Sequence, residues 1–402
     1  MDGGRSVPDG ARGGVRSSEV GAQSADADGS LPAEADERFM ARAVELARRG
    51  AGWTSPNPLV GAVIVRDGRI IGEGWHHRFG GPHAEREALA ACSESPAGAT
   101  AYVTLEPCCH TGKTPPCTEA LIEAGIARVV VGVLDPNPLV AGRGNEALRR
   151  AGIEVAVGVL EPSCRAVNEP FLHAMEQRRP LVIAKYAMTL DGKVATREGL
   201  SRWVTGEAAR RRVHEDRHRH AGVMVGIGTA LADDPLLTCR LDGREVSQPA
   251  RVVVDAARLP LESQLVRTAS EAPVIVAVAE GALLARRNAL AERGCAVVAV
   301  PAREGRVDPR ILMELLWQRF SLDSLIVEGG PTLLGSLFDE GLVDRVQAYI
   351  APKIFGGLEA LGPVAGRGVG DPADAPVLSE VSLQMMGGDV LLEGRLQPCS
   401  PV

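Results

Sequence analysis

Hydrophobic and polar positions in the first half of the chain follow helix and strand periods in turn. A helical pattern at 39–49 precedes two strand patterns, at 59–65 and 69–75, which the turn Asp67-Gly68 joins as a hairpin. Further helical patterns begin near His83 and at 117 and 145, and strand patterns follow at 101–105, 128–134 and 153–159. Strands that alternate with helices predict a three-layer α/β/α sandwich around a mixed sheet.

A second series of alternating patterns begins after Gln177-Arg178-Arg179-Pro180, the predicted domain boundary. Strand patterns lie at 180–187, 221–226, 251–255, 273–279, 295–300, 322–328 and 345–351, with helical patterns at 207–218, 311–320 and 332–340. The chain ends in a hairpin pattern around Gly387-Gly388-Asp389. We therefore expect one α/β domain over 36–178 and a second over 179–402, each with its own core.

Composition restricts the classes of protein that the chain can represent. Of its 402 residues, 45% are hydrophobic and 24% are charged, which is typical of globular domains. No apolar run reaches the roughly 18 residues of a membrane span, so we expect no membrane partner. The net charge of −7 argues against a nucleic-acid surface, which would carry excess Lys and Arg. Eight cysteines are too few for a disulfide scaffold, which favours the cytoplasm.

Residues 1–35 differ from the rest of the chain. They are rich in Gly, Ser, Asp and Ala, and they contain almost no large apolar residues. They lack the apolar core of a signal peptide, and their acidic residues do not fit a mitochondrial transit peptide. We expect a disordered tail without an assigned function.

The strongest chemical signal is His83-Ala84-Glu85, followed by Pro107-Cys108 and Cys117. One imidazole and two thiolates can hold Zn²⁺ and leave its fourth position to water, as catalytic zinc sites do. Glu85 is close enough in sequence to transfer protons without binding the metal. The pattern matches the His-x-Glu and Pro-Cys signature of zinc deaminases, except that eight residues separate Cys108 from Cys117 instead of two.

Three other interpretations of these residues stay open. The zinc could be structural, or the His and Cys side chains could simply be buried. A nucleic-acid-editing deaminase shares the same metal site. Three Tyr and six Phe leave few side chains for stacking on single strands, which disfavours this third interpretation.

Three segments of the second half are candidates for ligand contacts. The strand ending in Glu328-Gly329-Gly330 runs into a helix, where backbone N–H groups could bind an anion, although such a turn is often only a tight connection. It does not match Gly-x-Gly-x-x-Gly, which disfavours a Rossmann domain. The basic run 210–220 is either a solvated helix face or the source of one phosphate-binding Arg. Asp233-Asp234 before Pro235 could serve acid–base chemistry or cap a turn.

These residues and their order make the chain resemble the bifunctional deaminase–reductases of bacterial riboflavin biosynthesis over about residues 36–400. The matching motifs in the first half are Ser55-Pro-Asn-Pro-Leu-Val-Gly61, Gly74-Trp-His76, Pro82-His-Ala-Glu85, Thr104-Leu-Glu-Pro-Cys108, Gly112-Lys-Thr-Pro-Pro-Cys117, Asp135-Pro-Asn-Pro138 and Ala141-Gly-Arg-Gly144. Those in the second half are Lys185 with Leu190-Asp-Gly192, Leu231-Ala-Asp-Asp-Pro235 and Val327-Glu-Gly-Gly-Pro-Thr332. The long spacer between the two cysteines is much more specific to this family than the zinc signature.

The resemblance implies two activities on two folds. A cytidine-deaminase-like α/β/α sandwich would remove the 2-amino group of 2,5-diamino-6-(5-phosphoribosylamino)pyrimidin-4(3H)-one. A dihydrofolate-reductase-like α/β domain would then use NADPH to reduce the ribosyl chain to ribityl. In the first domain, His83, Cys108 and Cys117 would hold one zinc ion and Glu85 would be the proton shuttle. Substrate contacts there are expected from Asn57, His76 and Lys113.

In the second domain, the resemblance implies one set of residues at the substrate and another at NADPH. The substrate set is Ser201, Arg217, Leu237, Arg240 and Glu328. The NADPH set is Ala187, Trp203, Thr229, Asp233, Gly330, Pro331, Thr332, Leu333, Leu334, Gly335 and Ser336. An enzyme with an inactive reductase-like domain is the alternative, and the intact Lys185 argues against it. The sequence leaves a homo-oligomer open.

One residue departs from the family pattern. Cys109 stands where the family more often has Ser, directly beside the expected ligand Cys108. If Cys108 faces the metal, the side chain of Cys109 points away from it, so we expect Cys109 to stay outside the metal site.

Overall fold

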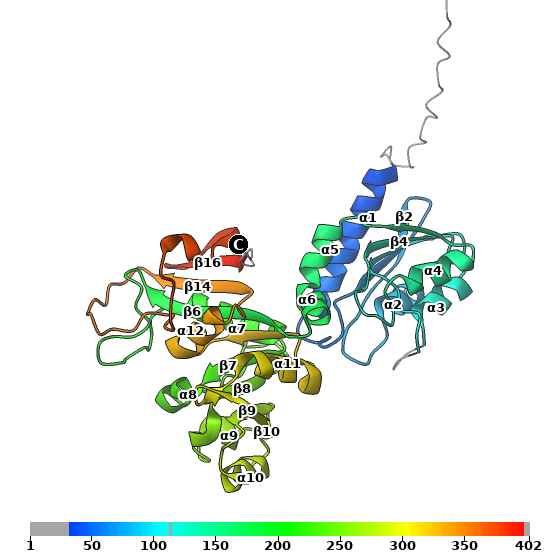
Figure 1. Ribbon diagram of the computed structural model, residues 1–402. Helices are drawn as coiled ribbons and strands as arrows, with labels where there is room; N and C mark the ends of the chain where they lie inside the picture. The colour runs from blue at the N-terminus through cyan, green and yellow to red at the C-terminus, as the bar shows by residue number, and fades with distance from the viewer. Residues whose placement is uncertain (1–31, 112–114, 398–402) are drawn as a thin grey trace, which may run out of the picture.

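Two β-sheets, each covered by helices, organise the chain into two lobes (Figure 1). The structure is a computed structural model that describes residues 32–111 and 115–397. The strands of the first sheet lie between residues 61 and 157, and those of the second larger sheet lie between 181 and 396. None of the helices in these two described stretches is both long and apolar enough to cross a membrane.

The first sheet has five strands in the order β2-β1-β3-β4-β5. Strand β1 (Gly61–Arg66) pairs antiparallel with β2 (Arg69–Trp75) and with β3 (Thr100–Leu105). Strands β4 (Arg128–Val133) and β5 (Glu154–Val157) continue the sheet in parallel. The expected mixed sheet is confirmed.

Helices cover both faces of this sheet and bury alternate strand residues. One face packs against α1 (Pro32–Ala47), α5 (Glu161–Val167) and α6 (Glu169–Gln177). The other packs against α2 (Ala84–Ala90), α3 (Cys117–Glu123) and α4 (Arg143–Arg150). Neighbouring strand residues point to opposite faces, so Val63 contributes to the first core and Ile64 to the second.

Helix α1 begins earlier than the sequence pattern indicated. It starts at Pro32, so the expected disordered tail of 1–35 is too long by four residues; residues 1–31 lie outside the described part. The early start has a tertiary cause, because Ala35 is buried and the Asp36 carboxylate accepts two hydrogen bonds from Arg128, each 2.8 Å long. A short Arg48–Gly50 turn of 3₁₀ helix follows α1.

The second sheet has nine strands in the order β10-β9-β8-β7-β13-β6-β14-β16-β15. Seven of them run parallel, and β16 and β15 form the expected C-terminal hairpin, antiparallel to β14. Their bounds are β6 Leu181–Thr189, β7 Gly222–Gly226, β8 Ala250–Val254, β9 Val274–Ala279, β10 Ala296–Val300, β13 Ser324–Val327, β14 Arg345–Ala351, β15 Leu378–Met386 and β16 Asp389–Leu396. A separate two-stranded ribbon joins β11 (Ala302–Arg303) to β12 (Arg306–Val307).

Helices cover both faces of the second sheet as well. They are α7 Glu207–Arg219, α8 Ile227–Asp233, α9 Gln264–Arg267, α10 Leu284–Glu292, α11 Pro309–Phe320 and α12 Pro331–Asp339, with short 3₁₀ turns at Ala256–Arg258 and Pro372–Asp374. The sequence patterns gave α7, α11 and α12 and missed α5, α6, α8, α9 and α10. All five missed helices have nine or fewer residues, but so do the predicted helices α2, α3, α4 and α12, so length alone does not explain which helices were missed.

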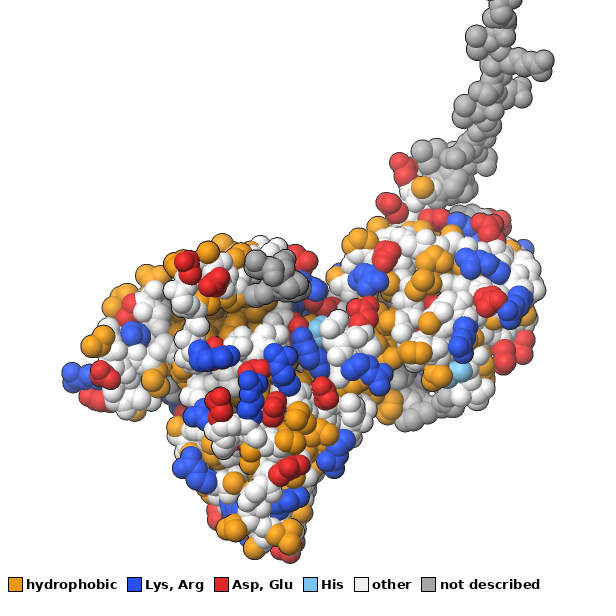
Figure 2. Space-filling model, in the orientation of Figure 1, with side chains coloured by type: hydrophobic (Ala, Val, Ile, Leu, Met, Phe, Trp, Pro, Cys, Tyr) orange, Lys and Arg blue, Asp and Glu red, His pale blue; other side chains and the backbone are white. Residues whose placement is uncertain are grey.

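The two lobes meet along ion pairs between α6 and the second sheet. The Glu169 carboxylate of α6 pairs with Arg345 at 2.7 Å and with Arg395. Figure 2 shows charged side chains gathered at this junction. A second junction, formed by residues 50–57, is described below.

Candidate active sites

The expected zinc ligands come from three segments that the first sheet brings together. His83 precedes the first residue of α2, Cys108 lies in the loop after β3, and Cys117 is the first residue of α3. Their ligand atoms all lie within 4.8 Å of one another. His83 Nδ1 is 3.6 Å from Cys108 Sγ and 3.4 Å from Cys117 Sγ. Tetrahedral zinc with bonds of about 2.0 Å to N and about 2.3 Å to S would separate these atoms by about 3.5 Å, so the donor set fits the ion.

Cys109 does not join this cluster. Its Sγ lies 3.8 Å from the carbonyl oxygen of Leu139. In the described part of the chain, the group of potential ligands at this point consists of His83, Cys108 and Cys117. The expectation that Cys109 points away from its neighbour's site is confirmed.

Charge around the cluster favours a thiolate at Cys108. The hydrogen bond with Cys117 and the neighbouring His83 lower the pKa of the Cys108 thiol to about 4, against the opposing effect of burial. Glu85 is 3% exposed, and burial followed by the negative charge of Cys108 raises the pKa of its carboxyl to about 7. A carboxyl with a pKa near neutrality can both accept and release a proton, as a proton shuttle must.

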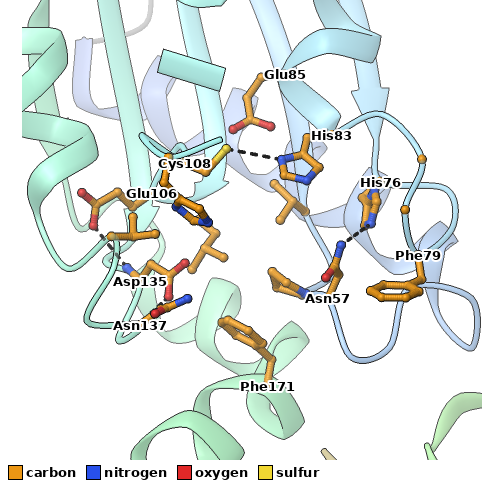
Figure 3. Close-up of a pocket in the computed structure, with 17 residues that line it drawn as sticks. Asn57, His76, Phe79, His83, Glu85, Glu106, Cys108, Asp135, Asn137 and Phe171 are labelled. Atoms are coloured by element: carbon orange, nitrogen blue, oxygen red, sulfur yellow. Dashed lines mark hydrogen bonds between the residues drawn. The ribbon is translucent and has the colours of Figure 1, made fainter. Parts of the chain in front are cut away.

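A cavity of about 310 Å³ opens in front of this cluster (Figure 3). This volume is within the range of small-molecule sites. Its wall combines apolar side chains with convergent polar ones, and Phe171 reaches it from α6. The lining residues are Asn57, Pro58, Val60, His76, Phe79, Gly80, Gly81, His83, Glu85, Leu105, Glu106, Cys108, His110, Asp135, Asn137, Val140 and Phe171.

Asn57 and His76 lie in this wall as a hydrogen-bonded pair. Asn57 Nδ2 is 3.1 Å from His76 Nε2, and His76 Nδ1 is 2.9 Å from the carbonyl oxygen of Pro82. Since a carbonyl accepts, Nδ1 carries the proton and Nε2 accepts from Asn57. Burial lowers the pKa of His76, which favours this neutral ring. The pair therefore fixes the Asn57 amide and leaves its oxygen and second N–H for a ligand.

Sequence reasoning missed the role of Glu106. Its buried carboxylate accepts hydrogen bonds from the backbone N–H groups of Gly142 at 2.9 Å, Asn145 at 3.1 Å and Asp135 at 3.4 Å. It therefore holds the loop between β4 and α4, which carries Asp135 and Asn137 into the cavity wall (Figure 3). Burial raises the pKa of Asp135 to about 6. The only sequence signal for Glu106 and Asp135 was that each lies in a motif already matched to the family.

Lys113, the third expected substrate contact of the first domain, lies outside the described residues. Asn57 and His76 are thus the two expected contacts that the structure brings to the cavity, at the side of the cluster opposite Glu106 (Figure 3).

A buried charge cluster lies at the carboxyl end of β13. The Glu328 carboxylate accepts two hydrogen bonds from Arg217 of α7, at 2.6 and 2.8 Å, and Lys185 Nζ of β6 lies 3.7 Å away. Burial alone would raise the pKa of Glu328, but the charges of Arg217 and Lys185 outweigh it and lower this pKa to about 2. Burial lowers the pKa of Lys185. Sequence reasoning named all three residues without predicting that they would be paired.

The expected substrate residues after α8 lie next to this cluster. Arg217 Nη1 also donates to the carbonyl oxygen of Thr238 at 3.0 Å, and Arg240 Nη1 donates to the Thr238 hydroxyl at 2.8 Å. Leu237 is buried with φ of +55°, so its side chain packs in the core. Ser201 lies apart from them in sequence, half-buried in the loop between β6 and α7.

The turn after Glu328 approaches the neighbouring strand closely. A Cβ at Gly329 would lie 2.7 Å from Val225 Cα, so only glycine allows this approach. The Gly330 N–H donates to the Thr229 hydroxyl at 2.8 Å, which joins two of the expected cofactor segments. Helix α12 starts at Pro331, and Thr332 is exposed in its first turn.

Within the expected cofactor segment 330–336, two positions face away from solvent. Leu334 is 2% exposed and belongs to the core, and a Cβ at Gly335 would lie 2.1 Å from the carbonyl oxygen of Ala365. Neither residue therefore has a side chain that could contact a ligand. Leu333 and Ser336 are half-buried.

The remaining expected cofactor residues lie on β6, α8 and the loop between β6 and α7. Ala187 is on β6, and Asp233 is the last residue of α8. Asp233 accepts a hydrogen bond at its carbonyl from Arg202, the residue before Trp203. Trp203 itself is 65% exposed, with the Arg210 guanidinium 4.7 Å from its ring centroid.

Comparison with known proteins decides the family. A family model described as the RibD C-terminal domain matches residues 180–392, and one described as the cytidine and deoxycytidylate deaminase zinc-binding region matches residues 33–133. The riboflavin biosynthesis protein RibD of Actinobacillus pleuropneumoniae is 48% identical over 359 residues, which are 89% of this chain and 94% of that protein. This chain belongs to the RibD family. The RibD of Aquifex aeolicus is 44% identical and covers 84% of this chain and 92% of its own length.

Solved RibD structures share the whole fold. The structure of Acinetobacter baumannii RibD matches with a TM-score of 0.84 at 37% identity and covers 91% of this chain and 100% of its own. A Thermotoga maritima structure matches with a TM-score of 0.79 at 39% identity, covering 91% and 99%, and is described as a diaminohydroxyphosphoribosylaminopyrimidine deaminase/5-amino-6-(5-phosphoribosylamino)uracil reductase. The expected deaminase-like and reductase-like folds are confirmed.

As a RibD family member, the chain is a bifunctional enzyme of riboflavin biosynthesis, a deaminase and a reductase in one polypeptide. Its cofactors are zinc for the deaminase and NADPH for the reductase. The activities and cofactors expected from the sequence are therefore confirmed, and the small size of the deaminase cavity suits a small-molecule substrate.

Proposed function

We propose that the first domain hydrolyses the 2-amino group of 2,5-diamino-6-(5-phosphoribosylamino)pyrimidin-4(3H)-one, and that the second reduces the resulting 5-amino-6-(5-phosphoribosylamino)uracil to its ribitylamino form. The observation that carries this proposal is the cluster His83, Cys108 and Cys117 beside buried Glu85 in a cavity of about 310 Å³. The Thermotoga maritima protein, described by these two activities, matches 91% of the chain.

In the first domain, His83, Cys108 and Cys117 would hold zinc, a Lewis acid that would activate water for hydrolysis. Glu85 would accept a proton as the water oxygen bonds to C2 and pass it to the ring nitrogen; it would then carry the hydroxyl proton to the departing amine, so that ammonia leaves and a carbonyl forms. Asn57, fixed by His76, is in place to hydrogen-bond the pyrimidine edge. We keep Lys113 as a substrate contact from the family motif alone.

In the second domain, NADPH would supply the hydride that reduces C1 of the opened ribose. We propose that the turn at Gly330 and the following residues to Ser336, with Ala187, Trp203, Thr229 and Asp233, line the cofactor. Arg240 suits a phosphate-binding role because its guanidinium is exposed and is linked through Thr238 to the buried Arg217 and Glu328 pair. Ser201 and Leu237 would complete the substrate contacts.

We also propose a domain boundary between residues 178 and 179 and a cytoplasmic location. The boundary falls between the end of α6 at Gln177 and the start of β6 at Leu181. The seven described cysteines are all free, which suits a reducing compartment.

The two half-reactions can be tested separately on one purified chain. With the diaminopyrimidine as substrate, ammonia release should be followed by NADPH oxidation at the nicotinamide absorbance. Glu85→Gln should abolish ammonia release, keep bound zinc and leave NADPH oxidation intact when the deaminated intermediate is supplied. Ammonia release at the normal rate would contradict the proton-shuttle role. Absent NADPH oxidation in the wild-type chain would contradict an active reductase domain.

A further inference from the structure

Residues 50–57 of the first domain rest on helix α7 of the second domain. The Trp53 ring meets the His218 ring edge to face, with centroids 5.4 Å apart and planes at 75°. Gly52 lies flat against the same imidazole: a Cβ there would be 2.5 Å from His218 Cε1, and its φ is +83°. Only glycine permits both this approach and this backbone conformation. Two successive residues, Gly52 and Trp53, therefore form this contact between the two domains.

The second domain holds His218 in one orientation. The Ser247 N–H lies 3.1 Å from His218 Nδ1, and the Ser247 hydroxyl donates to the His218 carbonyl oxygen at 2.9 Å. Nδ1 therefore accepts, and the ring is neutral with its proton on Nε2. His218 is only 9% exposed. The imidazole is thus a fixed surface on which the Trp53 turn can pack.

Arg78 adds a second contact to Trp53. Its guanidinium lies 4.3 Å from the Trp53 ring centroid, and Nη2 donates to the Glu245 carboxylate at 2.8 Å. Glu245 is two residues before Ser247, so one loop of the second domain binds both Arg78 and His218, the two side chains that contact Trp53. Arg78 and Glu245 are exposed, so this ion pair alone contributes little.

The turn that rests on His218 also shapes the deaminase cavity. The Phe79 N–H donates to the Trp53 carbonyl oxygen at 3.0 Å, and the Asn57 N–H donates to the Thr54 carbonyl oxygen at 2.7 Å. Asn57 and Phe79 both line the cavity beside the metal cluster (Figure 3). The position of these two wall residues is therefore linked by main-chain hydrogen bonds to the turn packed against α7.

We propose that the reductase domain positions the substrate-binding wall of the deaminase, with His218 and Trp53 as the positioning residues. Neither side chain touches the cavity; they act through Asn57 and Phe79. The proposal rests on the proposed substrate contact of Asn57. It assigns the reductase domain a second task, which is to complete the deaminase of the same chain.

The test compares His218→Ala and Trp53→Ala in the full-length, zinc-loaded enzyme by steady-state ammonia release. Each change should raise the deaminase KM about tenfold, while kcat and zinc content stay near wild type, because a loosened wall loses binding and not proton transfer. The double variant should raise KM no further than either single change, since both remove the same contact.

Arg345→Ala is the matched control. Arg345 also lies in the second domain and contacts the first, through Glu169 at 2.7 Å, but its ion pairs are with Glu169 and Glu380 and not with residues 50–57. It should leave the deaminase KM unchanged. An equal rise in this control would show a general loosening of the domains and overturn the proposal, as would an unchanged KM in His218→Ala.

Amide hydrogen exchange supplies a second readout that does not depend on activity. The amides of Asn57 and Phe79 should exchange faster in His218→Ala and at the wild-type rate in Arg345→Ala; unchanged exchange in His218→Ala overturns the proposal. Asn57→Ala tests the proposed substrate contact of Asn57 separately from the proposed coupling between the two domains. If it leaves KM unchanged, the proposed substrate contact fails; if it raises KM and His218→Ala does not, only the coupling fails.

Discussion

The buried pair Arg217–Glu328 allows a quantitative prediction for Arg217→Met. In the folded protein the Glu328 carboxylate accepts two hydrogen bonds from Arg217, and the two side chains are 8% and 11% exposed respectively. Methionine would fill much of the space but would leave the carboxylate with Lys185 as its nearest cation, 3.7 Å away. Removing one partner of a buried ion pair typically costs about 3–5 kcal/mol.

The lowered pKa of Glu328 agrees in sign with this cost, and it combines the effect of burial with the opposing charges of Arg217 and Lys185. This pKa falls from 4.5 to about 2 in the folded protein. At neutral pH that difference corresponds to about 3 kcal/mol, since each pH unit is worth about 1.4 kcal/mol. A carboxyl whose pKa is lowered by folding stabilises the protein above pH 4.5, and the contribution is lost as pH falls towards 2. We therefore expect Arg217→Met to lower the stability of the second domain by about 3 kcal/mol at pH 7.

Differential scanning calorimetry of the full chain can measure this loss. For a domain of this size, about 3 kcal/mol corresponds to a fall in Tm of about 10 °C. The difference in free energy of unfolding between wild type and Arg217→Met should decrease by about 1 kcal/mol from pH 7 to pH 4, because the Glu328 carboxyl of the unfolded chain begins to take up a proton.

Arg211→Met, on the same helix, is the control for this variant. Arg211 is 72% exposed and lies 3.7 Å from Glu215, so its loss should cost less than about 0.5 kcal/mol. If Arg217→Met shifts Tm no more than Arg211→Met, or by an amount that does not change with pH, the assigned role of the buried pair is wrong.

Two further predictions concern the metal and the turn after Glu328. Cys108→Ser should lose both zinc and ammonia release, whereas Cys109→Ser should keep both, because Cys109 Sγ faces the Leu139 carbonyl. Elemental analysis of the two purified variants measures the zinc content. Zinc loss in Cys109→Ser would contradict the ligand assignment. Gly329→Ala should destabilise the second domain by about 1–3 kcal/mol, because its Cβ would lie 2.7 Å from Val225 Cα. Gly228→Ala, where a Cβ meets nothing within 4 Å, should leave thermal stability unchanged or slightly raised, and an equal loss in both would refute the steric argument.

The sequence alone determined the chemistry of the deaminase and the class of both domains. The ligands His83, Cys108 and Cys117 were recognisable because zinc needs particular donor atoms at restricted spacings. Strands such as β1 and β6 were recognisable because a buried strand appears in the sequence as a short, nearly continuous run of apolar residues. Five short helices, α5, α6, α8, α9 and α10, were missed, although α2, α3, α4 and α12 of similar length were predicted.

Only the tertiary structure decided which distant residues work together. Arg217 and Glu328 are 111 residues apart, and no local pattern pairs them. The clamp of Glu106 on the loop before α4 and the packing of Trp53 on His218 likewise depend on contacts between segments far apart in the chain. Spacing along a chain reports local geometry, whereas these contacts form only when two sheets and two lobes have folded and come together. The sequence therefore determined which groups are present, and the fold determined which partners hold them.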